Sequence, residues 1–326
     1  MLAARYEQTG PAHDVIVVGE VETPEPGPGE VRVRVAVSGV NPTDWKTRSG
    51  TTPRPTDAPF QIPNQDGAGT IDAVGDGVDP AREGERVWIW LAAAGRPWGT
   101  AAEYTVVPAE RAVPLPDRAS FELGASLGVP ALTAHRCLLA DGPIQGATVL
   151  VAGGAGAVGR TAIELARWAG AGRVVATVSS EEKAAIARAA GAEATVDYKA
   201  PNALERLKEA APDGVDRIVE LSLGHNLALD VGAAAPDCVI SSYANEGPNP
   251  ELEVRPLMTA NISLRFVLLY TMPRAAIEQA VADVSRALAD AALTEPALHH
   301  FALEQTAHAH DAVEQGAVGK VVIDVA

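Results

Sequence analysis

The chain has few cysteines and few aromatic residues. Only two of its 326 residues are cysteine, and Phe, Trp and Tyr together make up 4%. Cys137 and Cys238 both stand in apolar surroundings, so we expect two buried free thiols rather than a disulfide or a pair of metal ligands. A structural zinc site built from four cysteines is therefore excluded.

Positive charge is also scarce. Acidic residues outnumber basic ones by 42 to 26, which gives a formal net charge of −16. Nucleic acids and anionic membranes need a basic surface, so we expect neither as a partner. No apolar run reaches the roughly 18 residues that cross a bilayer. Residues 1–7 lack the basic and apolar regions of a signal peptide, and the expected location is the cytoplasm.

The most informative segment joins an apolar run to a glycine-rich turn and then to a helix-compatible stretch. Residues 149–152 are apolar, 153–159 contain the pattern Gly-x-Gly-x-x-Gly, and 160–168 can form a helix. Backbone N–H groups in such a turn approach a dinucleotide pyrophosphate, and the helix N-terminus supplies partial positive charge. A tight turn without a ligand is the alternative, but the strand–turn–helix context favours phosphate binding. The predicted cofactor-binding residues of this turn are Gly153, Gly154, Ala155, Gly156, Ala157, Val158 and Gly159.

The pattern of apolar residues changes near residue 124. Before it, short alternating segments such as 31–37 lie between turns rich in Gly and Pro, which is typical of a barrel-like β domain. After it, strands and helices alternate, which predicts a parallel, doubly wound sheet. We expect an α/β protein with a β-rich domain over 1–123 and 268–326 and a dinucleotide-binding domain over 124–267. The strands of the second domain are expected at 148–152, 173–178, 194–197, 216–221, 238–243 and 262–270, and its helices at 157–169, 181–190, 203–210 and 226–235.

The end of the second strand of this sheet distinguishes NAD from NADP cofactors. An NAD site places Asp or Glu there to accept from the ribose 2′-hydroxyl. Here the strand ends in Ser179 and Ser180, and Lys183 follows within one helical turn. Hydroxyls and a cation suit a 2′-phosphate, although Lys183 can also be a plain surface residue. Glu181 and Glu182 add negative charge nearby, but at a helix start they can serve the macrodipole and point to solvent. We therefore predict NADPH.

Short motifs at 39–44, 48–50, 63–69, 73–75, 128–134, 153–159 and 319–322 follow one another in a specific order. Together they resemble the medium-chain dehydrogenase/reductase superfamily, and most closely its zinc-free, zeta-crystallin-like NADPH:quinone oxidoreductases. The resemblance implies a GroES-like catalytic domain, a Rossmann domain and a homodimer in which strand 262–270 pairs with its partner copy. Around the cofactor it implies roles for Thr177, Ser179 or Ser180, Lys183, Tyr198 and Lys320.

No metal site is predicted. Zinc members of the superfamily use a Cys and a Gly-His-Glu motif, whereas this chain has Asn41 and Gln65-Asp66 at those positions. Neither offers a thiolate or an imidazole. A late cluster of histidines could be read as a metal or proton-transfer site, but a solvated helix edge and loop is favoured because no zinc signature accompanies it. Its members are His299, His300, His308 and His310.

The resemblance places three catalytic candidates near the nicotinamide. Asn41 can donate an amide N–H to a substrate carbonyl oxygen, although Asn-Pro is also ordinary turn chemistry. Thr133 can bond the nicotinamide or its ribose, or simply its own backbone. Lys46 stands where the quinone oxidoreductases have a tyrosine, and it can stabilise an enolate or bind cofactor phosphates. Asp44 is expected to cap a helix beginning at Trp45 rather than to act as a catalytic acid.

The expected activity is metal-free, NADPH-dependent hydride transfer to a small molecule, either a quinone or an α,β-unsaturated carbonyl compound. One alternative is an enoyl reductase that acts on thioester-bound intermediates. Another is a protein that binds NADPH without turnover. Trp88, Trp90 and Trp98 could bind a planar substrate, with barrel packing as the alternative.

Overall fold

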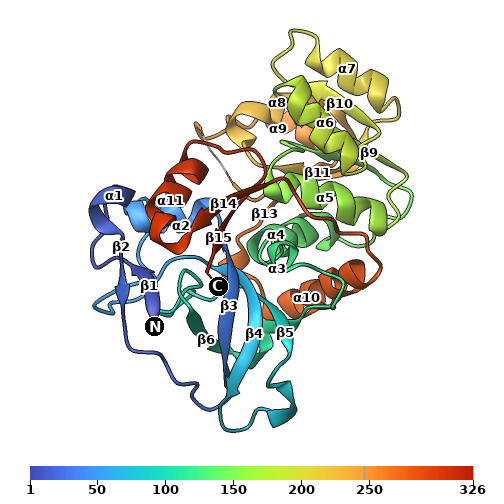
Figure 1. Cartoon of the computed structure of the whole chain (residues 1–326). Coiled ribbons are helices and arrows are strands. Elements are labelled where there is room, and N and C mark those ends of the chain that lie inside the picture. The colour runs from blue at the N-terminus through green and yellow to red at the C-terminus, as the bar shows by residue number, and fades with distance from the viewer. Residues whose placement is uncertain (245–246, 326) are drawn as a thin grey trace. The chain divides into compact units, whose positions relative to one another are not determined.

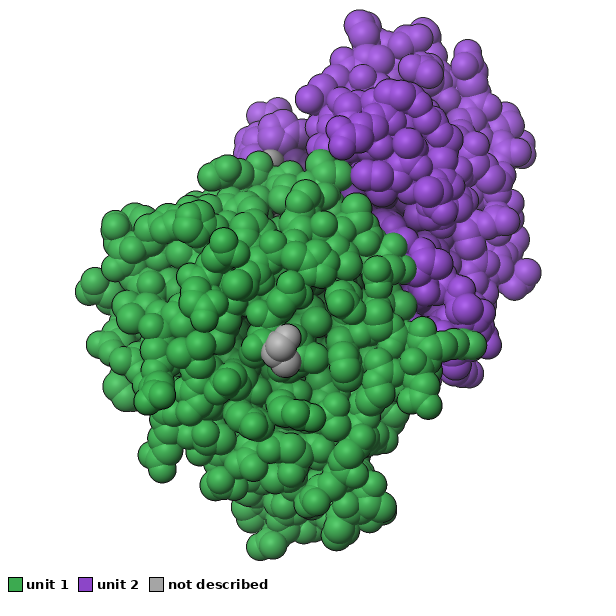
Figure 2. All heavy atoms as spheres, viewed as in Figure 1, with its two compact units in different colours: residues 1–129, 295–326 green, residues 130–294 purple. Residues whose placement is uncertain are grey.

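The computed structural model describes residues 1–244 and 247–325, and the chain divides into two compact units (Figures 1 and 2). Unit 1 comprises Met1–Val129 and Glu295–Ala326, and unit 2 comprises Pro130–Thr294. The α/β class is confirmed, with a β-rich unit and a parallel-sheet unit. Among the described residues, no helix is long and apolar enough to cross a membrane.

The sheet of unit 1 is organised around one long strand, β3 (Glu30–Val40). Its burial alternates along Val31, Val33 and Val35, as the sequence pattern predicts. Three strands pair with it, all antiparallel. The strand order is β14-β15-β3-β4-β5-β7, with β6 also on β3, and β1 and β2 form a separate pair. The bounds are β1 Leu2–Arg5, β2 Val17–Glu20, β4 Asp66–Val74, β5 Arg86–Ile89, β6 Tyr104–Pro108, β7 Ala112–Pro114, β14 Leu298–Ala302 and β15 Lys320–Asp324.

Short helices accompany this sheet. They are α1 (Ala12–Val15), α2 (Pro42–Ser49), α3 (Phe121–Gly124) and α11 (Thr306–Glu314), and α4 (Gly128–Leu139) begins at the end of the first segment of the unit. Helix α2 starts directly after β3, with a proline at its first position, where the missing N–H costs no helical hydrogen bond.

The sheet of unit 2 is entirely parallel and has the order β10-β9-β8-β11-β12-β13. Numbered from its own first strand, that order is 3-2-1-4-5-6, the doubly wound arrangement of a Rossmann sheet. The central strands are buried on both faces, and Leu150, Val175 and Ile218 form its core. The strands are β8 Thr148–Val151, β9 Arg173–Val178, β10 Ala194–Asp197, β11 Val215–Glu220, β12 Ala234–Ser242 and β13 Ser263–Phe266.

The helices of this unit are α5 Ala157–Trp168, α6 Glu181–Ala189, α7 Ala203–Ala210, α8 Leu223–Ala233, α9 Val254–Thr259 and α10 Arg274–Ala289. The second compact unit ends at Thr294, whereas the expected domain boundary lay at 267/268. Helix α10 accounts for the difference, because it packs on the nucleotide-domain helices. Trp168 of α5 donates to Asp290 at 2.9 Å, and His135 of α4 lies 2.8 Å from Asp283.

One expectation about local structure is wrong. The strand expected at 262–270 is only β13, since residues after Phe266 leave the sheet and Leu269–Thr271 forms a 3₁₀ turn. A short apolar run does not by itself distinguish a strand from such a turn. Of the three tryptophans considered for a planar substrate, Trp88 is fully buried and Trp98 packs edge-on against Phe60, which favours the packing alternative for these two.

Candidate functional site

Buried polar side chains gather in unit 1 where β3, β4 and β15 meet. Asn41 directly follows β3, Asp66 begins β4 opposite Gly39, and Lys320 begins β15. Each of these three residues is at most 2% exposed. We call Asn41, Asp44, Asp66 and Lys320 the buried polar cluster.

The Asn41 amide bridges the two charges of this cluster. Its Nδ2 donates to Asp66 Oδ2 at 2.7 Å, and its Oδ1 accepts from Lys320 Nζ at 2.7 Å. The Lys320 ammonium also lies 3.6 Å from Asp66 Oδ2. Burial lowers the pKa of Lys320 and raises that of Asp66, and the attraction between the two groups opposes both shifts. These contacts support an ion pair, because each charge has a charged partner and a hydrogen bond.

Asp44 is the third charged residue of the cluster. Helix α2 begins at Pro42 rather than Trp45, so Asp44 is its third residue and reaches back to accept from the Asn41 backbone N–H at 2.7 Å. This contact belongs to a capping box. Burial, reinforced by the negative charge of Asp66, raises the pKa of Asp44 to about 8. Asp44 is therefore protonated at neutral pH.

The second oxygen of Asp66 accepts from the backbone of the next helix. Val129 N–H donates to Asp66 Oδ1 at 2.9 Å. The preceding residue must be glycine for this approach, since a Cβ at Gly128 would lie 2.0 Å from the same oxygen. The close approach of Asp66 therefore explains why this sequence motif has glycine at position 128.

A chain of hydrogen bonds supports the cluster from behind. His310 Nε2 donates to Asn64 Oδ1 at 3.0 Å, and the Asn64 amide donates to Ser38 Oγ at 2.9 Å. Ser38 then contacts Thr100 at 2.7 Å, and Thr100 donates to the backbone oxygen of Asp66 at 2.5 Å. His310 belongs to the histidine cluster expected to be solvated, and that expectation is wrong for it. Burial and the nearby Arg48 guanidinium lower its pKa to about 3, so the ring is neutral.

The glycine-rich turn of unit 2 has the geometry that the motif predicts. Gly153 has φ = 65°, a conformation that favours glycine. A Cβ at Gly159 would lie 2.3 Å from the Gly153 oxygen, so the helix packs closely on the turn. At Gly156 the nearest obstacle to a Cβ is 3.4 Å away, an ordinary contact. No atom of the described residues requires glycine at this position, which fits a backbone that an external group such as pyrophosphate approaches closely.

The other predicted cofactor residues lie at the carboxyl ends of strands next to this turn. Gly153 N–H approaches Thr177 Oγ1 at 3.3 Å, and the Tyr198 N–H donates to the Val178 oxygen at 3.2 Å. These contacts bring the ends of β8, β9 and β10 together at one edge of the sheet. The Tyr198 ring is 42% exposed.

The loop after β9 combines hydroxyls with a cation. Ser180 caps α6 by accepting from the Lys183 N–H at 3.3 Å, and Lys183 Nζ lies 3.2 Å from Ser179 Oγ. Glu181 pairs with Arg188 along the helix surface, with its side chain 84% exposed. The loop therefore presents Ser179 and Lys183 together, and the carboxylate of Glu181 is engaged elsewhere.

Three further predicted site residues remain to be placed. Thr133 is buried in the middle of α4 in unit 2. Lys46 is half-buried on α2, with its ammonium 5.6 Å from the centre of the Trp45 ring. Lys320, predicted to bind the cofactor, has its ammonium in contact with Asn41 and Asp66 within unit 1.

Two acidic residues of unit 2 were missed, Glu220 on β11 and Asp230 on α8. Glu220 ends β11, is fully buried and accepts from Asn226 at 3.0 Å. Burial raises its pKa and that of the neighbouring Asp230, and the charge of Glu220 raises the latter further. A glutamate at the end of the apolar strand β11 was the available signal for Glu220.

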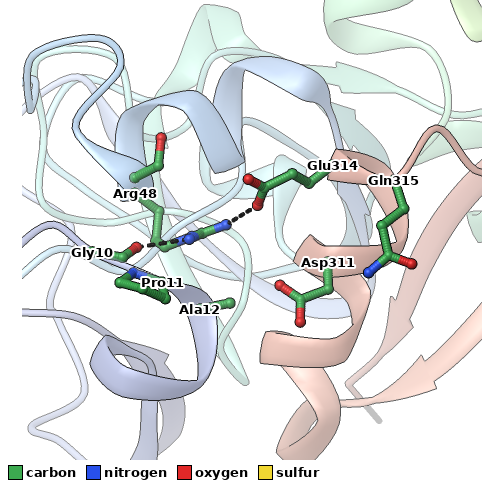
Figure 3. Close-up of a pocket in the computed structure, with 8 residues that line it drawn as sticks. Gly10, Pro11, Ala12, Arg48, Asp311, Glu314 and Gln315 are labelled. Atoms are coloured by element: carbon green, nitrogen blue, oxygen red, sulfur yellow. Dashed lines mark hydrogen bonds and ion pairs between the residues drawn. The ribbon is translucent and has the colours of Figure 1, made fainter.

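A separate hollow in unit 1 contains none of the predicted site residues (Figure 3). It has a volume of about 520 Å³. The Arg48 guanidinium donates to the Gly10 oxygen and to Glu314, both at 2.7 Å, as the dashed lines show. Its lining residues are Gly10, Pro11, Ala12, Arg48, Ser49, Asp311, Glu314 and Gln315. Over the described residues, no three His, Cys, Asp or Glu side chains are grouped as metal ligands would be.

Unit 1 is a GroES-like β unit with a buried polar cluster, and unit 2 is a Rossmann sheet with a pyrophosphate-type turn. Together these features define a class of two-domain nucleotide-binding proteins. Family models described as "Alcohol dehydrogenase GroES-like domain" and "Zinc-binding dehydrogenase" match residues 27–117 and 157–286. The chain belongs to the medium-chain dehydrogenase/reductase superfamily, among its quinone oxidoreductase-like members.

Similarity to individual relatives extends over the whole chain. The quinone oxidoreductase of Lama guanicoe is 30% identical, over 99% of this chain and 97% of its own. A solved NAD-dependent alcohol dehydrogenase is 28% identical with a TM-score of 0.91, and a mycobacterial protein solved with NADPH is 28% identical with a TM-score of 0.84. Both structural matches cover 100% of each chain.

Replacing Asp44 by asparagine is expected to flatten the pH dependence of stability. The folded Asp44 carboxyl keeps its proton up to a pKa of about 8, whereas an unfolded aspartate releases it near about 4. Its contribution is fully present below about pH 4 and is lost as the pH rises toward about 8. Urea unfolding from about pH 5 to pH 8 should show a smaller loss of free energy of unfolding in Asp44→Asn than in wild type. The exposed Asp57→Asn is the control and should follow wild type; a parallel Asp44→Asn profile would contradict the assignment.

Proposed function

We propose that this protein is an NADPH-dependent reductase that transfers hydride, without a metal ion, to quinones or to the activated C=C bond of α,β-unsaturated carbonyl compounds. The observation that supports it most directly is the edge of the unit 2 sheet, where a bare glycine turn lies beside a loop of hydroxyls and one cation. The name "Quinone oxidoreductase" of relatives matched along their whole length supports the acceptor class.

The described residues fit NADPH. The turn at 153–159 would hold the pyrophosphate, because Gly156 leaves the backbone accessible and the N-terminus of α5 favours negative charge. Ser179, Ser180 and Lys183 would hold the 2′-phosphate through hydroxyl donors and an ammonium. The exposed Tyr198 ring would lie against the adenosine. The mycobacterial relative solved with NADPH is consistent with this choice.

The donor set of the buried polar cluster favours chemistry without zinc. An amide and a carboxylate stand where zinc relatives have Cys and the Gly-His-Glu motif, and the Lys320 ammonium already contacts both. Because the lysine already neutralises the charge at these oxygens, they would bind a second cation only weakly.

Bound NADPH supplies the hydride, and the side chains of this chain position and polarise the acceptor. Asn41 has one N–H committed to Asp66, and its second N–H would donate to the carbonyl oxygen as negative charge develops there. Thr133 would bond the nicotinamide or its ribose. Lys46 would stabilise an enolate with its ammonium, and water would supply the final proton.

A substrate panel tests the reaction class. Loss of NADPH absorbance is measured with 1,4-benzoquinone, a cyclic enone, an enoyl thioester and no acceptor, each with and without a chelator. We expect reduction of the quinone or the enone at a rate that the chelator leaves unchanged. Exclusive activity on the thioester would favour the enoyl reductase alternative, for which the lysine at position 46 is the supporting feature. Binding of NADPH without turnover of any acceptor would make the protein non-catalytic.

Removing the Lys183 ammonium is expected to weaken NADPH and not NADH. A charge-assisted contact to phosphate contributes about 1.5 kcal/mol, so the KM for NADPH in Lys183→Ala should rise about tenfold. The exposed Lys208→Ala in the same unit is the control and should leave both KM values unchanged. Equal wild-type kcat/KM values for NADH and NADPH would overturn the assignment of the cofactor.

We also propose that the protein is a homodimer formed through the β13 end of the unit 2 sheet. Strand β13 is the last in the sheet order. Large apolar side chains are exposed on and near it, with Phe266 at 73%, Leu268 at 57% and Met258 at 69%. A bare strand edge with such side chains invites pairing with a second copy.

Charge at this edge should dissociate the dimer. Wild type is expected to have a mass twice the 33.7 kDa of one chain by light scattering after size exclusion. Phe266→Asp combined with Leu268→Asp should shift it to the monomer mass, because like charges would face each other across the symmetric contact. Val17→Asp, which replaces an equally exposed apolar residue of unit 1, is the control and should remain dimeric. A monomeric wild type would refute the proposal.

A further inference from the structure

The Asn41 side chain can in principle adopt two orientations. The oxygen and the NH₂ group of a carboxamide are nearly equal in size, so sterics alone do not select one. In this protein the two sides of the amide differ in charge. Lys320 Nζ lies 2.7 Å from Oδ1, and Asp66 Oδ2 lies 2.7 Å from Nδ2. Rotation by half a turn would place the ammonium against NH₂ and the carboxylate against oxygen, which makes both contacts repulsive.

We propose that Lys320 and Asp66 are positioning residues, a charged clamp that fixes the orientation of the Asn41 amide so that its second N–H points to the substrate oxygen. This inference rests on the proposed function, in which Asn41 contacts the acceptor. The clamp also polarises the amide. The ammonium at the amide oxygen withdraws electron density from the amide nitrogen, so the remaining N–H becomes a stronger donor.

The clamp is held on both sides. The Asp66 carboxylate is anchored by the Val129 N–H, and its backbone oxygen by Thr100. The Lys320 N–H donates to the Ala297 oxygen at 2.9 Å, and its Cε lies 3.0 Å from the position a Cβ would take at Gly39. Because both ends are buried, the charges cannot relax into water and their direction is fixed before substrate arrives.

A double-mutant cycle tests whether Lys320 acts through Asn41. Lys320→Met and Asn41→Ala are each expected to lower kcat/KM for the preferred acceptor about 100-fold, the usual loss for one donor to a developing oxyanion. The double variant should lose about 100-fold as well, and not the ten-thousandfold that independent roles would give. Lys320→Arg should recover part of the loss, and the Kd for NADPH should stay within about twofold throughout.

Arg48→Met is the matched control. Arg48 is likewise a cation with a 2% exposed side chain paired to a carboxylate in unit 1, and it lies outside the buried polar cluster. Its loss should lower stability and leave kcat/KM within about twofold. If Lys320→Met does not fold, Lys320→Met with Asp66→Asn removes both charges together and takes its place in the cycle. A full 100-fold loss on adding Lys320→Met to Asn41→Ala would overturn the clamp.

A spectroscopic measurement separates this inference from the proposed function. In ¹⁵N NMR spectra of the protein without cofactor, the Asn41 side-chain NH₂ is assigned by its disappearance in Asn41→Ala. We expect two distinct, exchange-protected proton signals in wild type and in Arg48→Met, and altered, unprotected signals in Lys320→Met. Unchanged signals in Lys320→Met would refute the clamp. Absence of turnover in wild type with those signals present would refute the proposed function and leave the clamp standing.

Discussion

Unit 1 depends on how one buried ammonium is shared between two buried carboxyl groups. Two carboxyl groups, Asp44 and Asp66, share the single ammonium of Lys320. An unpaired charge cannot remain in such a place without a large desolvation penalty. The cluster is therefore stable only as a neutral group, in which Asp66 forms the ion pair and Asp44 keeps its proton. The Asn41 amide lies between the two charges, and they fix its orientation.

Unit 2 meets the opposite requirement, because it must attract an anion within a chain of net charge −16. It does so with backbone rather than with many side chains. The turn before α5 offers N–H groups and a helix N-terminus, and Lys183 adds one ammonium beside Ser179. Among the nearby acidic residues, Glu181 pairs with Arg188, and burial raises the pKa of both Glu220 and Asp230.

Local features were the ones that the sequence predicted well. The expected strand at 173–178 and helix at 203–210 coincide with β9 and α7, and the glycine turn folds as its motif requires. These elements are specified by periodicity and by neighbouring residues. The partners of Lys320 were not predictable in this way, since 279 positions separate it from Asn41 and only the pairing of β15 with β3 joins them. His310 was misread for the same reason, because its partner Asn64 lies 246 positions away.

The residues predicted to bind the cofactor and the residues of the buried polar cluster come from different parts of the chain. All residues from Pro130 to Thr294 form one compact unit, and it contains the complete glycine turn and the Lys183 loop. The cluster needs both ends of the chain, because Asn41 and Asp66 precede that unit and Lys320 follows it. Until β15 pairs with β3, Asp66 has no cation and its burial is unfavourable. Strand β15, which follows unit 2 in the chain, therefore both completes the sheet of unit 1 and supplies the charge that orients Asn41.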